Sequence, residues 1–262
     1  MAVLPPGTLL QLMYLRERLL HVKPGRFVEI GPGSGEITQL LLDLGWVGQS
    51  YDLEKVTIER LQMRFANQIK QGQYRTVNAD YLSQSLQMEP ADIVISCMVM
   101  EHLDDVSESA FMRRSSEVLK SDGMMIGLVP GSPTHWGIED DIAGHCRRYT
   151  RGKILSLMAN TDWTTGHLVG LTFPISNFLL PISNFLVNRS EKSKLSLTTI
   201  ERTKQSGRRN VKFKTHFPSL LGMILNYRFL WPLHLLQKIF KNSDRALVIY
   251  FESRPHPQTK NI

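Results

Sequence analysis

The sequence predicts an α/β fold in which a mostly parallel sheet is doubly wound, with helices on both faces. Three observations predict it: apolar strands alternate with amphipathic helical segments, four successive strands end in small or polar residues, and a glycine-rich turn follows the first strand. Open parallel sheets bind their ligands at the carboxyl ends of the strands. The sequence therefore predicts a ligand-binding edge together with the fold class.

Residues 1–24 predict an N-terminal helical cap. Leucine and methionine recur there at roughly helical spacing between Leu9 and Leu20. Two prolines near the start and the charged triplet Arg16-Glu17-Arg18 do not fit the charge-then-apolar order of a signal peptide. We expect this helix to lie over the mouth of the ligand site.

Residues 25–171 predict the sheet and its helices. We expect strands at about 26–31, 47–52, 74–79, 91–97, 124–129 and 163–171, and helices at about 35–44, 54–70, 104–120 and 151–160. Ser121-Asp122-Gly123 predicts the turn that leads into the fifth of these strands. A last strand is expected at about 246–252, inside the C-terminal segment 244–262.

The turn after the first strand indicates what the site binds. Gly31, Gly33 and Gly35 stand at every second position, whereas a dinucleotide fold requires the spacing G-x-G-x-x-G. The place of that last glycine is taken by Glu36, an acid that would repel a phosphate at a helix start. Glu29, at the end of the strand, offers a carboxylate suited to an ammonium group. The predicted ligand therefore carries an amino acid rather than a diphosphate.

The next three strand ends add further polar groups. Asp52, followed by Leu53, lies close to the offset of ~20 residues at which such folds bind ribose hydroxyls. Asp80 and Tyr81 follow the third strand, where an acid can accept from an adenine amine and a ring can lie on the base. Cys97 ends the fourth. Each acid alone could simply cap a helix, but four strand ends in agreement favour one binding site.

These motifs together resemble those of the class I methyltransferases that use S-adenosylmethionine (SAM). The resemblance implies a Rossmann-like sheet of seven strands in the order 3-2-1-4-5-7-6, with the seventh antiparallel. It also implies SAM as cofactor and S-adenosylhomocysteine as product. The residues that it assigns to the cofactor are Glu29, Gly31, Gly33, Gly35, Asp52, Leu53, Asp80, Tyr81 and Cys97.

Two histidines are candidates for the base that accepts a proton from the methyl acceptor. Glu101-His102-Leu103 resembles the motif after strand four in the quinone O-methyltransferase branch. The stretch 141–150, which contains Gly144-His145-Cys146-Arg147-Arg148-Tyr149, resembles one found in bacterial enzymes of quinone and cell-envelope pathways. We favour His145 over His102, because His102 opens a helix and can serve as its cap.

The residues after His145 are candidates for binding the acceptor. Arg147 and Arg148 could fork onto a carboxylate or phosphate, or one of them could pair with Asp140 or Asp141 and fix the loop. Tyr149 is a further acceptor contact or a packing residue.

A metal site is not expected. The loop holds His135, Glu139, Asp140, Asp141 and His145, but their spacing matches no known metal motif, and adjacent acids are typical of a solvated turn. The two cysteines, Cys97 and Cys146, show no paired spacing either, which favours a reducing, cytoplasmic location.

Residues 172–243 form an insertion before the last strand, which we expect to be largely helical. It opens with the direct repeat 174–180 and 181–187, whose two prolines interrupt the apolar run and argue against a transmembrane span. Nine basic and two acidic residues follow between Arg189 and His216, a net charge of +7 that equals that of the whole chain. The roles left open are a lid over the acceptor, contact with an acidic membrane face, and a homo-oligomer contact.

The sequence thus predicts an enzyme that methylates an O or N atom of a small-molecule or lipid-like acceptor, such as a quinone-like, envelope or secondary-metabolite precursor. An anionic acceptor is one of the alternatives left open. An RNA or protein methyltransferase is disfavoured, because Ser96-Cys97-Met98-Val99 stands where amino-methylating enzymes carry an Asn/Asp-Pro-Pro-aromatic tetrad. Few aromatic residues interleave with the basic ones, which also disfavours nucleic acid. A SAM-binding partner or sensor without transfer activity is the remaining alternative.

Overall fold

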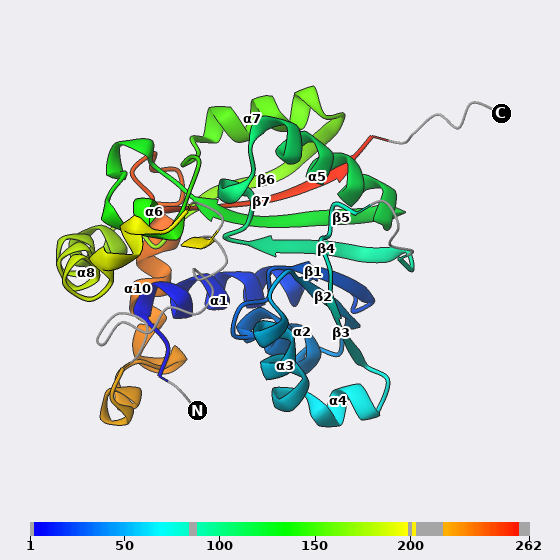
Figure 1. Ribbon diagram of the computed structural model, residues 1–262, viewed down its shortest axis with the longest axis horizontal. Coiled ribbons are helices and arrows are strands. Elements are labelled where there is room, and N and C mark those ends of the chain that lie inside the picture. Colours follow the sequence, from blue (N-terminus) through cyan, green and yellow to red (C-terminus); the bar gives the residue numbers. More distant parts are fainter. Residues whose placement is uncertain (1–2, 84–87, 199–200, 203–216, 257–262) are drawn as a thin grey trace.

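A computed structural model describes residues 3–83, 88–198, 201–202 and 217–256, and its centre is one seven-stranded sheet (Figure 1). The order is β3-β2-β1-β4-β5-β7-β6, as predicted. Strands β1 to β5 are parallel to one another, while β7 runs antiparallel to both β5 and β6. The bounds are β1 Arg26–Ile30, β2 Val47–Asp52, β3 Tyr74–Asn78, β4 Ala91–Cys97, β5 Leu119–Pro130, β6 Trp163–Leu171 and β7 Val248–Pro255.

Helices cover both faces of this sheet. Those of the core are α1 Pro6–Leu19, α2 Glu36–Asp43, α3 Lys55–Arg64, α4 Ala66–Lys70, α5 Asp105–Val118, α6 Ile138–Ala143 and α7 Arg151–Asn160. The single helix expected at 54–70 is divided at Phe65, whose ring is fully buried and packs edge-on against Tyr74. Turning this ring into the core takes Phe65 out of helical geometry, at φ −111° and ψ 27°.

The fifth strand begins earlier than the sequence predicts. β5 pairs with β4 already at Leu119, and the register then shifts so that Met124 pairs with Ile93. Ser121-Asp122-Gly123, expected to be a turn, is therefore extra chain that bulges out of the strand.

Two apolar cores lie on opposite faces of the sheet. Successive residues of a strand point to opposite faces. Accordingly Ile93 belongs to the cluster of α1 and α2, while the next residue, Val94, belongs to the cluster of α5 and α7. This two-sided burial is what a doubly wound sheet requires.

The insertion between β6 and β7 contributes α8 Ile175–Glu191, η3 Lys192–Ser196, η4 Ser219–Met223 and α10 Tyr227–Ile239. We expected prolines to interrupt its apolar repeat, but Pro181 lies inside α8, which continues through it. Pro181 has no N–H to donate to the carbonyl one turn earlier, so α8 lacks one helical hydrogen bond there. No helix among the described residues is long and apolar enough to cross a membrane. Of the predicted basic segment, residues 199–200 and 203–216 lie outside the described part of the chain.

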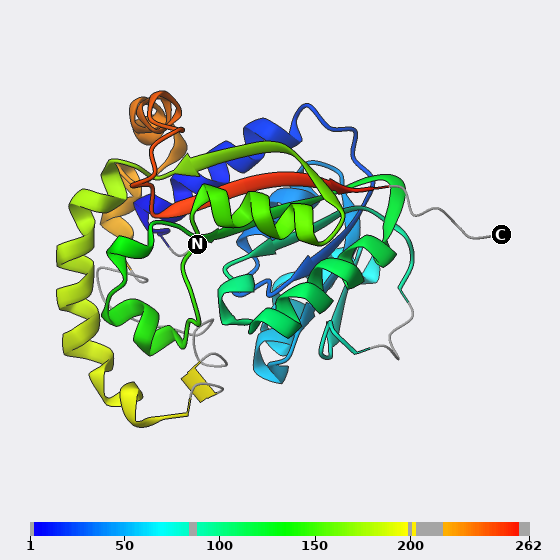
Figure 2. The same cartoon turned by 90° about the horizontal axis from the view of Figure 1, so that it is seen from above.

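α10 fastens the insertion to the N-terminal helix. Leu230 joins Leu9, Leu10 and Met13 of α1 in a third apolar cluster. The side chain of Gln237, fully buried, accepts from the Thr172 backbone N–H at 3.0 Å and donates to the Leu10 carbonyl at 3.0 Å. α8 is thereby held beyond the carboxyl end of β4, where it packs against α6 (Figure 2).

Candidate active site

The glycine-rich turn has the backbone conformation that its residues predict. Gly31, Gly33 and Gly35 all have positive φ, at 66°, 54° and 87°. A Cβ on Gly31 would meet the Val99 side chain at 2.5 Å, whereas one on Gly33 would meet nothing within 4 Å. Gly33 lines a cavity, so a side chain there would project into the space that a ligand needs.

Glu29 is buried at the base of this turn. Its Oε2 accepts hydrogen bonds from Thr38 Oγ1 at 2.5 Å and from Ser50 Oγ at 2.7 Å. Burial raises the pKa of Glu29 to about 7, and these two hydrogen bonds oppose the rise. An ammonium group of a ligand beside this carboxyl would favour its ionised form.

The acids that follow β2 and β3 lie at the same edge of the sheet. Asp52 Oδ1 accepts from the Glu54 N–H at 2.8 Å, and Asp80 Oδ1 accepts from the Leu82 N–H at 2.9 Å. Leu53 is 58% exposed. Their contacts with a cofactor stay predictions.

Tyr81 does not lie where the sequence predicts. The ring is 4% exposed and packs against Tyr51 and Phe111, with centroids at 5.8 and 5.4 Å. Its hydroxyl lies 3.3 Å from Ser115 Oγ, inside the core. A ring enclosed in this way cannot lie on an adenine base, so Tyr81 is a core residue.

A cavity of about 620 Å³ opens beside the glycine turn. Gly33, Cys97 and Met98 line it on the sheet side, and the start of α1 and one face of α8 line it on the other. Burial raises the pKa of the Cys97 thiol to about 12, which keeps it neutral. Both histidines singled out in the sequence, His102 and His145, line the same cavity.

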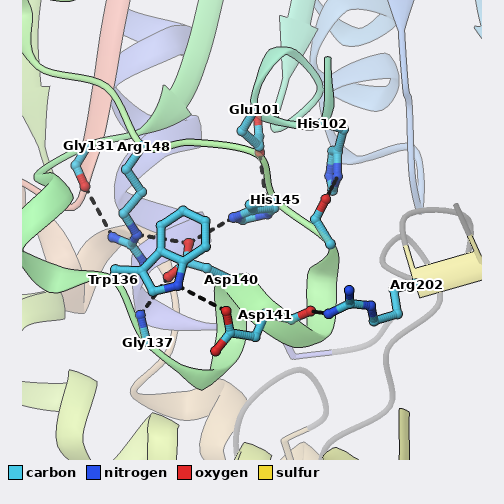
Figure 3. Close-up of polar contacts among 11 residues, drawn as sticks. Glu101, His102, Gly131, Trp136, Gly137, Asp140, Asp141, His145, Arg148 and Arg202 are labelled. Carbon is cyan, nitrogen blue, oxygen red and sulfur yellow. Dashed lines mark hydrogen bonds and ion pairs between the residues drawn. The ribbon is translucent and has the colours of Figure 1, made fainter. Parts of the chain in front are cut away.

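His145 is held by a buried acid (Figure 3). Its Nδ1 lies 2.8 Å from Oδ1 of Asp140, a side chain with no solvent exposure. The same oxygen accepts from Arg148 Nε at 2.8 Å, and Asp140 Oδ2 accepts from the Gly137 N–H at 2.9 Å. These contacts fix the ring so that Nε2 is the nitrogen that faces Glu101.

The second histidine lies against the first. The rings of His102 and His145 are 4.9 Å apart and nearly perpendicular. A backbone hydrogen bond of 2.7 Å, from the Cys146 N–H to the Glu101 carbonyl, joins their two loops. His102 closes η1 Met100–His102, and the cap of α5 is Asp104, which accepts from the Ser107 N–H; the expected capping role of His102 is therefore wrong.

Glu101 is the site residue whose importance the sequence did not reveal. It is fully buried, and its Oε1 lies 3.8 Å from His145 Nε2. Burial raises the pKa of Glu101 to about 7, and burial lowers the pKa of His102 to about 4. The available signal was its position, directly beside His102 after an apolar strand.

Of the three residues predicted to bind the acceptor, one lines the cavity and two do not. Arg147 contacts Asp105 and Glu108 of α5, and the buried Tyr149 hydroxyl donates to Glu108; neither residue lines the cavity. Arg148 does line it, but its guanidinium is bonded to Asp140 and to the Gly131 carbonyl. Arg148 thus fixes the loop, the alternative considered from the sequence.

The residues of the loop considered for a metal do not gather as a set. Asp141 accepts from Trp136 Nε1, and Glu139 accepts from Ser183 of α8. Within the described ranges, the group whose ligand atoms come close enough is Glu101, His102 and His145, with those atoms within 4.8 Å of one another.

A model of the methyltransferase-domain family matches residues 9–168, more than half of the chain. The chain belongs to this family. Together with the sheet order, the match places it in the class I SAM-dependent methyltransferase superfamily, as the sequence motifs predicted. SAM is accordingly the cofactor of this methyltransferase.

One curated sequence matches a short segment of the chain, and solved structures agree with it at the level of fold. The methyltransferase is 38% identical over 73 residues to the probable ribosomal RNA small subunit methyltransferase A of Methanospirillum hungatei JF-1, a match that covers 28% of each chain. Its structure is similar to the methyltransferase domain of bacterial CtHen1 (TM-score 0.53, 15% identity, 65% of this chain and 93% of that one). It is also similar to the glycopeptide N-methyltransferase MtfA (0.50, 14%, 61% and 79%) and to the mitomycin 7-O-methyltransferase MmcR (0.50, 13%, 62% and 50%). At such low identity the three structures show the fold alone.

Proposed function

We propose that this methyltransferase transfers the methyl group of SAM to an O or N atom of a small-molecule or lipid-like acceptor. The observation that carries the proposal is a single cavity that joins the cofactor turn to a polar cluster. Gly33 and Cys97 line one part of it, and His102 and His145 line another. Its volume of about 620 Å³ lies within the range of ~300–1,000 Å³ typical of small-molecule sites.

The lining of the cavity favours an acceptor with an apolar body and one polar end. α8 contributes aliphatic side chains to its wall, namely Leu179, Leu180, Ile182 and Leu186, and α1 adds Pro5 and Pro6. Polar groups gather at the opposite wall, around His145. Arg148 is the cation among the described lining residues, and Asp140 already neutralises it, so the cavity gives no support for a strongly anionic acceptor.

His145 and His102 are the groups that meet the reacting atom in this proposal. Methyl transfer is a direct displacement, so alignment of the acceptor with the sulfonium methyl supplies much of the rate. Asp140 occupies Nδ1 of His145, which leaves Nε2 as the nitrogen directed at the polar cluster. Cys97 and Met98, at the end of the strand that pairs with β1, line the same cavity as Gly33 and the two histidines.

The exposed apolar surface of the insertion fits the proposed lipid-like acceptor. Phe178, Ile182 and Phe185 of α8 are 76%, 59% and 64% exposed, and Phe229 and Trp231 of α10 are 65% and 53% exposed. Amphipathic helices with such residues bind at lipid surfaces, and nearby basic residues attract anionic lipids. Peripheral contact with an acidic membrane face would bring the cavity close to an acceptor of that kind. Co-sedimentation of the protein with anionic vesicles, compared with neutral ones, tests this point.

The short match to a ribosomal RNA methyltransferase makes RNA the second candidate acceptor. Incubation of the purified protein with methyl-labelled SAM and fractionated cell extract separates the candidates. The proposal expects label in organic-soluble small molecules, and it expects His145→Ala to retain SAM binding while transfer slows. Label in RNA or protein, or SAM binding without any transfer to any fraction, would refute it.

A further inference from the structure

Glu101 lines the cavity with a buried carboxylate that lacks hydrogen-bond partners from other described residues. Its side chain has no solvent exposure, and neither carboxylate oxygen accepts a hydrogen bond from any other residue that the structure describes. A buried ionised carboxylate without a hydrogen-bonding partner is strongly unfavourable. Glu101 also lines the cavity, so a ligand that enters there can complete its surroundings.

The two histidines stand around this carboxylate. His145 Nε2 lies 3.8 Å from Glu101 Oε1, too far for a hydrogen bond, and the three ligand atoms of Glu101, His102 and His145 all lie within 4.8 Å of one another. Two atoms that each bind zinc at ~2.1 Å in a tetrahedral site lie roughly 3.4 Å apart. The observed triangle is slightly wider, and closing it requires side-chain shifts of at most about 1.4 Å on these bond lengths.

The contacts at the second ring nitrogen of His102 and of His145 are of the kind found around histidines that bind a metal ion. Such a histidine usually donates its second ring N–H to a carboxylate or a backbone carbonyl, which fixes the tautomer and the ring orientation. Asp140 faces Nδ1 of His145 at 2.8 Å, and the Gly144 carbonyl lies 3.4 Å from Nδ1 of His102 (Figure 3). Arg148 in turn anchors Asp140.

We propose that Glu101, His102 and His145 bind one divalent transition-metal ion, with an open coordination position that faces the acceptor cavity. This inference rests on the proposed function, since it gives the ion the task of holding the acceptor. Two imidazoles and one carboxylate are the donor set of open zinc sites, and imidazole disfavours magnesium and calcium.

The open position receives the oxygen of an acceptor hydroxyl. That oxygen loses its proton to water, and one of its lone pairs then forms the bond to the methyl carbon of SAM. The carbon–sulfur bond breaks, and its electron pair stays on sulfur, which yields S-adenosylhomocysteine. In this arrangement His145 is a ligand, and the proton acceptor is water rather than its ring.

The test measures metal binding without relying on turnover. The full chain is stripped with a chelator and titrated with Co²⁺, whose visible ligand-field absorption reports on its coordination, and Zn²⁺ is then used in competition. We expect one ion per chain with a four- or five-coordinate spectrum. Because Glu101 is a direct ligand in this site, we expect Glu101→Gln to weaken binding by more than the roughly 10- to 100-fold typical of losing an outer contact. Asp141→Asn is the matched control, an acid of the same region outside the cluster, and it should bind as the wild type does. Calorimetry with SAM shows whether each variant is folded.

Binding at no defined stoichiometry, or equal affinity in a folded Glu101→Gln variant, would overturn the inference. Full methyl transfer by the metal-free protein would overturn it as well, and would leave the proposed function standing with His145 as the proton acceptor. Stoichiometric Co²⁺ binding that Glu101→Gln abolishes, in a protein that methylates no fraction, would support the metal site and refute the proposed function instead.

Discussion

Replacement of Asp140 by Asn tests the network that orients the site. Asp140 has no solvent exposure, and it accepts from Arg148, from the Gly137 N–H and from His145. The side chain of Arg148 is itself only 8% exposed. Asn keeps the shape of Asp but removes the charge and directs an amide N–H₂ toward groups that donate, so Asp140→Asn leaves the guanidinium without its counter-ion.

The expected loss follows from that burial. Breaking a buried ion pair by removal of one partner destabilises a protein by about 3–5 kcal/mol. For a chain of this size, each 1 kcal/mol lowers the melting temperature by roughly 2–4 °C, so the expected decrease is about 6–20 °C. Urea unfolding of the wild type and of Asp140→Asn, followed by circular dichroism, measures the difference in the free energy of unfolding.

Asp141→Asn is the control for this experiment. Asp141 is half-buried and accepts a hydrogen bond of 3.0 Å from the neutral Trp136 indole, which the amide oxygen of Asn can also accept. The expected loss of stability is therefore at most the about 0.5–1.5 kcal/mol of one such hydrogen bond. If Asp140→Asn unfolds within about 1 kcal/mol of Asp141→Asn, the buried network does not have the strength that its geometry implies.

Three further predictions concern the cofactor side. Asp52→Ala should weaken SAM binding by roughly 10- to 100-fold in calorimetry through loss of charged hydrogen bonds to the ribose, and unchanged affinity would remove this assignment. Gly33→Ala should lower SAM affinity more than Gly72→Ala does. Both glycines have positive φ and open space around them, but of the two only Gly33 lines the cavity. Equal SAM affinity in the two variants would contradict the role of Gly33. Because burial raises the pKa of Glu29 from 4.5 to about 7, the folded protein retains a proton that the unfolded chain has lost. Its stability should therefore fall by up to about 3 kcal/mol as pH rises from roughly 4.5 to 7, and Glu29→Gln should flatten this dependence in urea unfolding. Parallel curves for the two proteins would show that Glu29 has an ordinary pKa.

The parts of the fold that the sequence predicts well are those set by local geometry. The strands follow from runs of apolar residues, and the turn at Gly33 follows from a conformation that glycine adopts without strain. The first element that departs from prediction, the break at Phe65, depends on Tyr74, a partner in another element. Likewise, nothing near Tyr81 in the sequence indicates that Ser115 and Phe111 enclose its ring.

In the candidate site, too, the sequence predicts the features set locally but not those that depend on distant residues. Motif resemblance identified His102 and His145 separately, but contacts between their two loops, such as the hydrogen bond from the Cys146 N–H to the Glu101 carbonyl, bring them together. The roles of Arg147 and Glu101 depend on residues distant in the sequence, Glu108 of α5 in one case and His145 in the other. Spacing along the chain cannot reveal either.

The insertion supplies α8 as one wall of the cavity, separately from the strands and turn predicted to bind the cofactor. An isolated helix of the length of α8 is only marginally stable in water, so α8 needs support to form a cavity wall. Gln237 of α10 supplies part of that support, since it bonds both to Thr172, just before α8, and to Leu10 of α1. The wall residues Ile182 and Leu186 stand on α8 and line the cavity, whereas the predicted SAM acids Glu29, Asp52 and Asp80 are not among its lining residues. Under the proposed function, changes at Ile182 and Leu186 alter acceptor choice while the glycine turn is preserved, whereas loss of Gln237 removes the hydrogen bonds to Thr172 and Leu10.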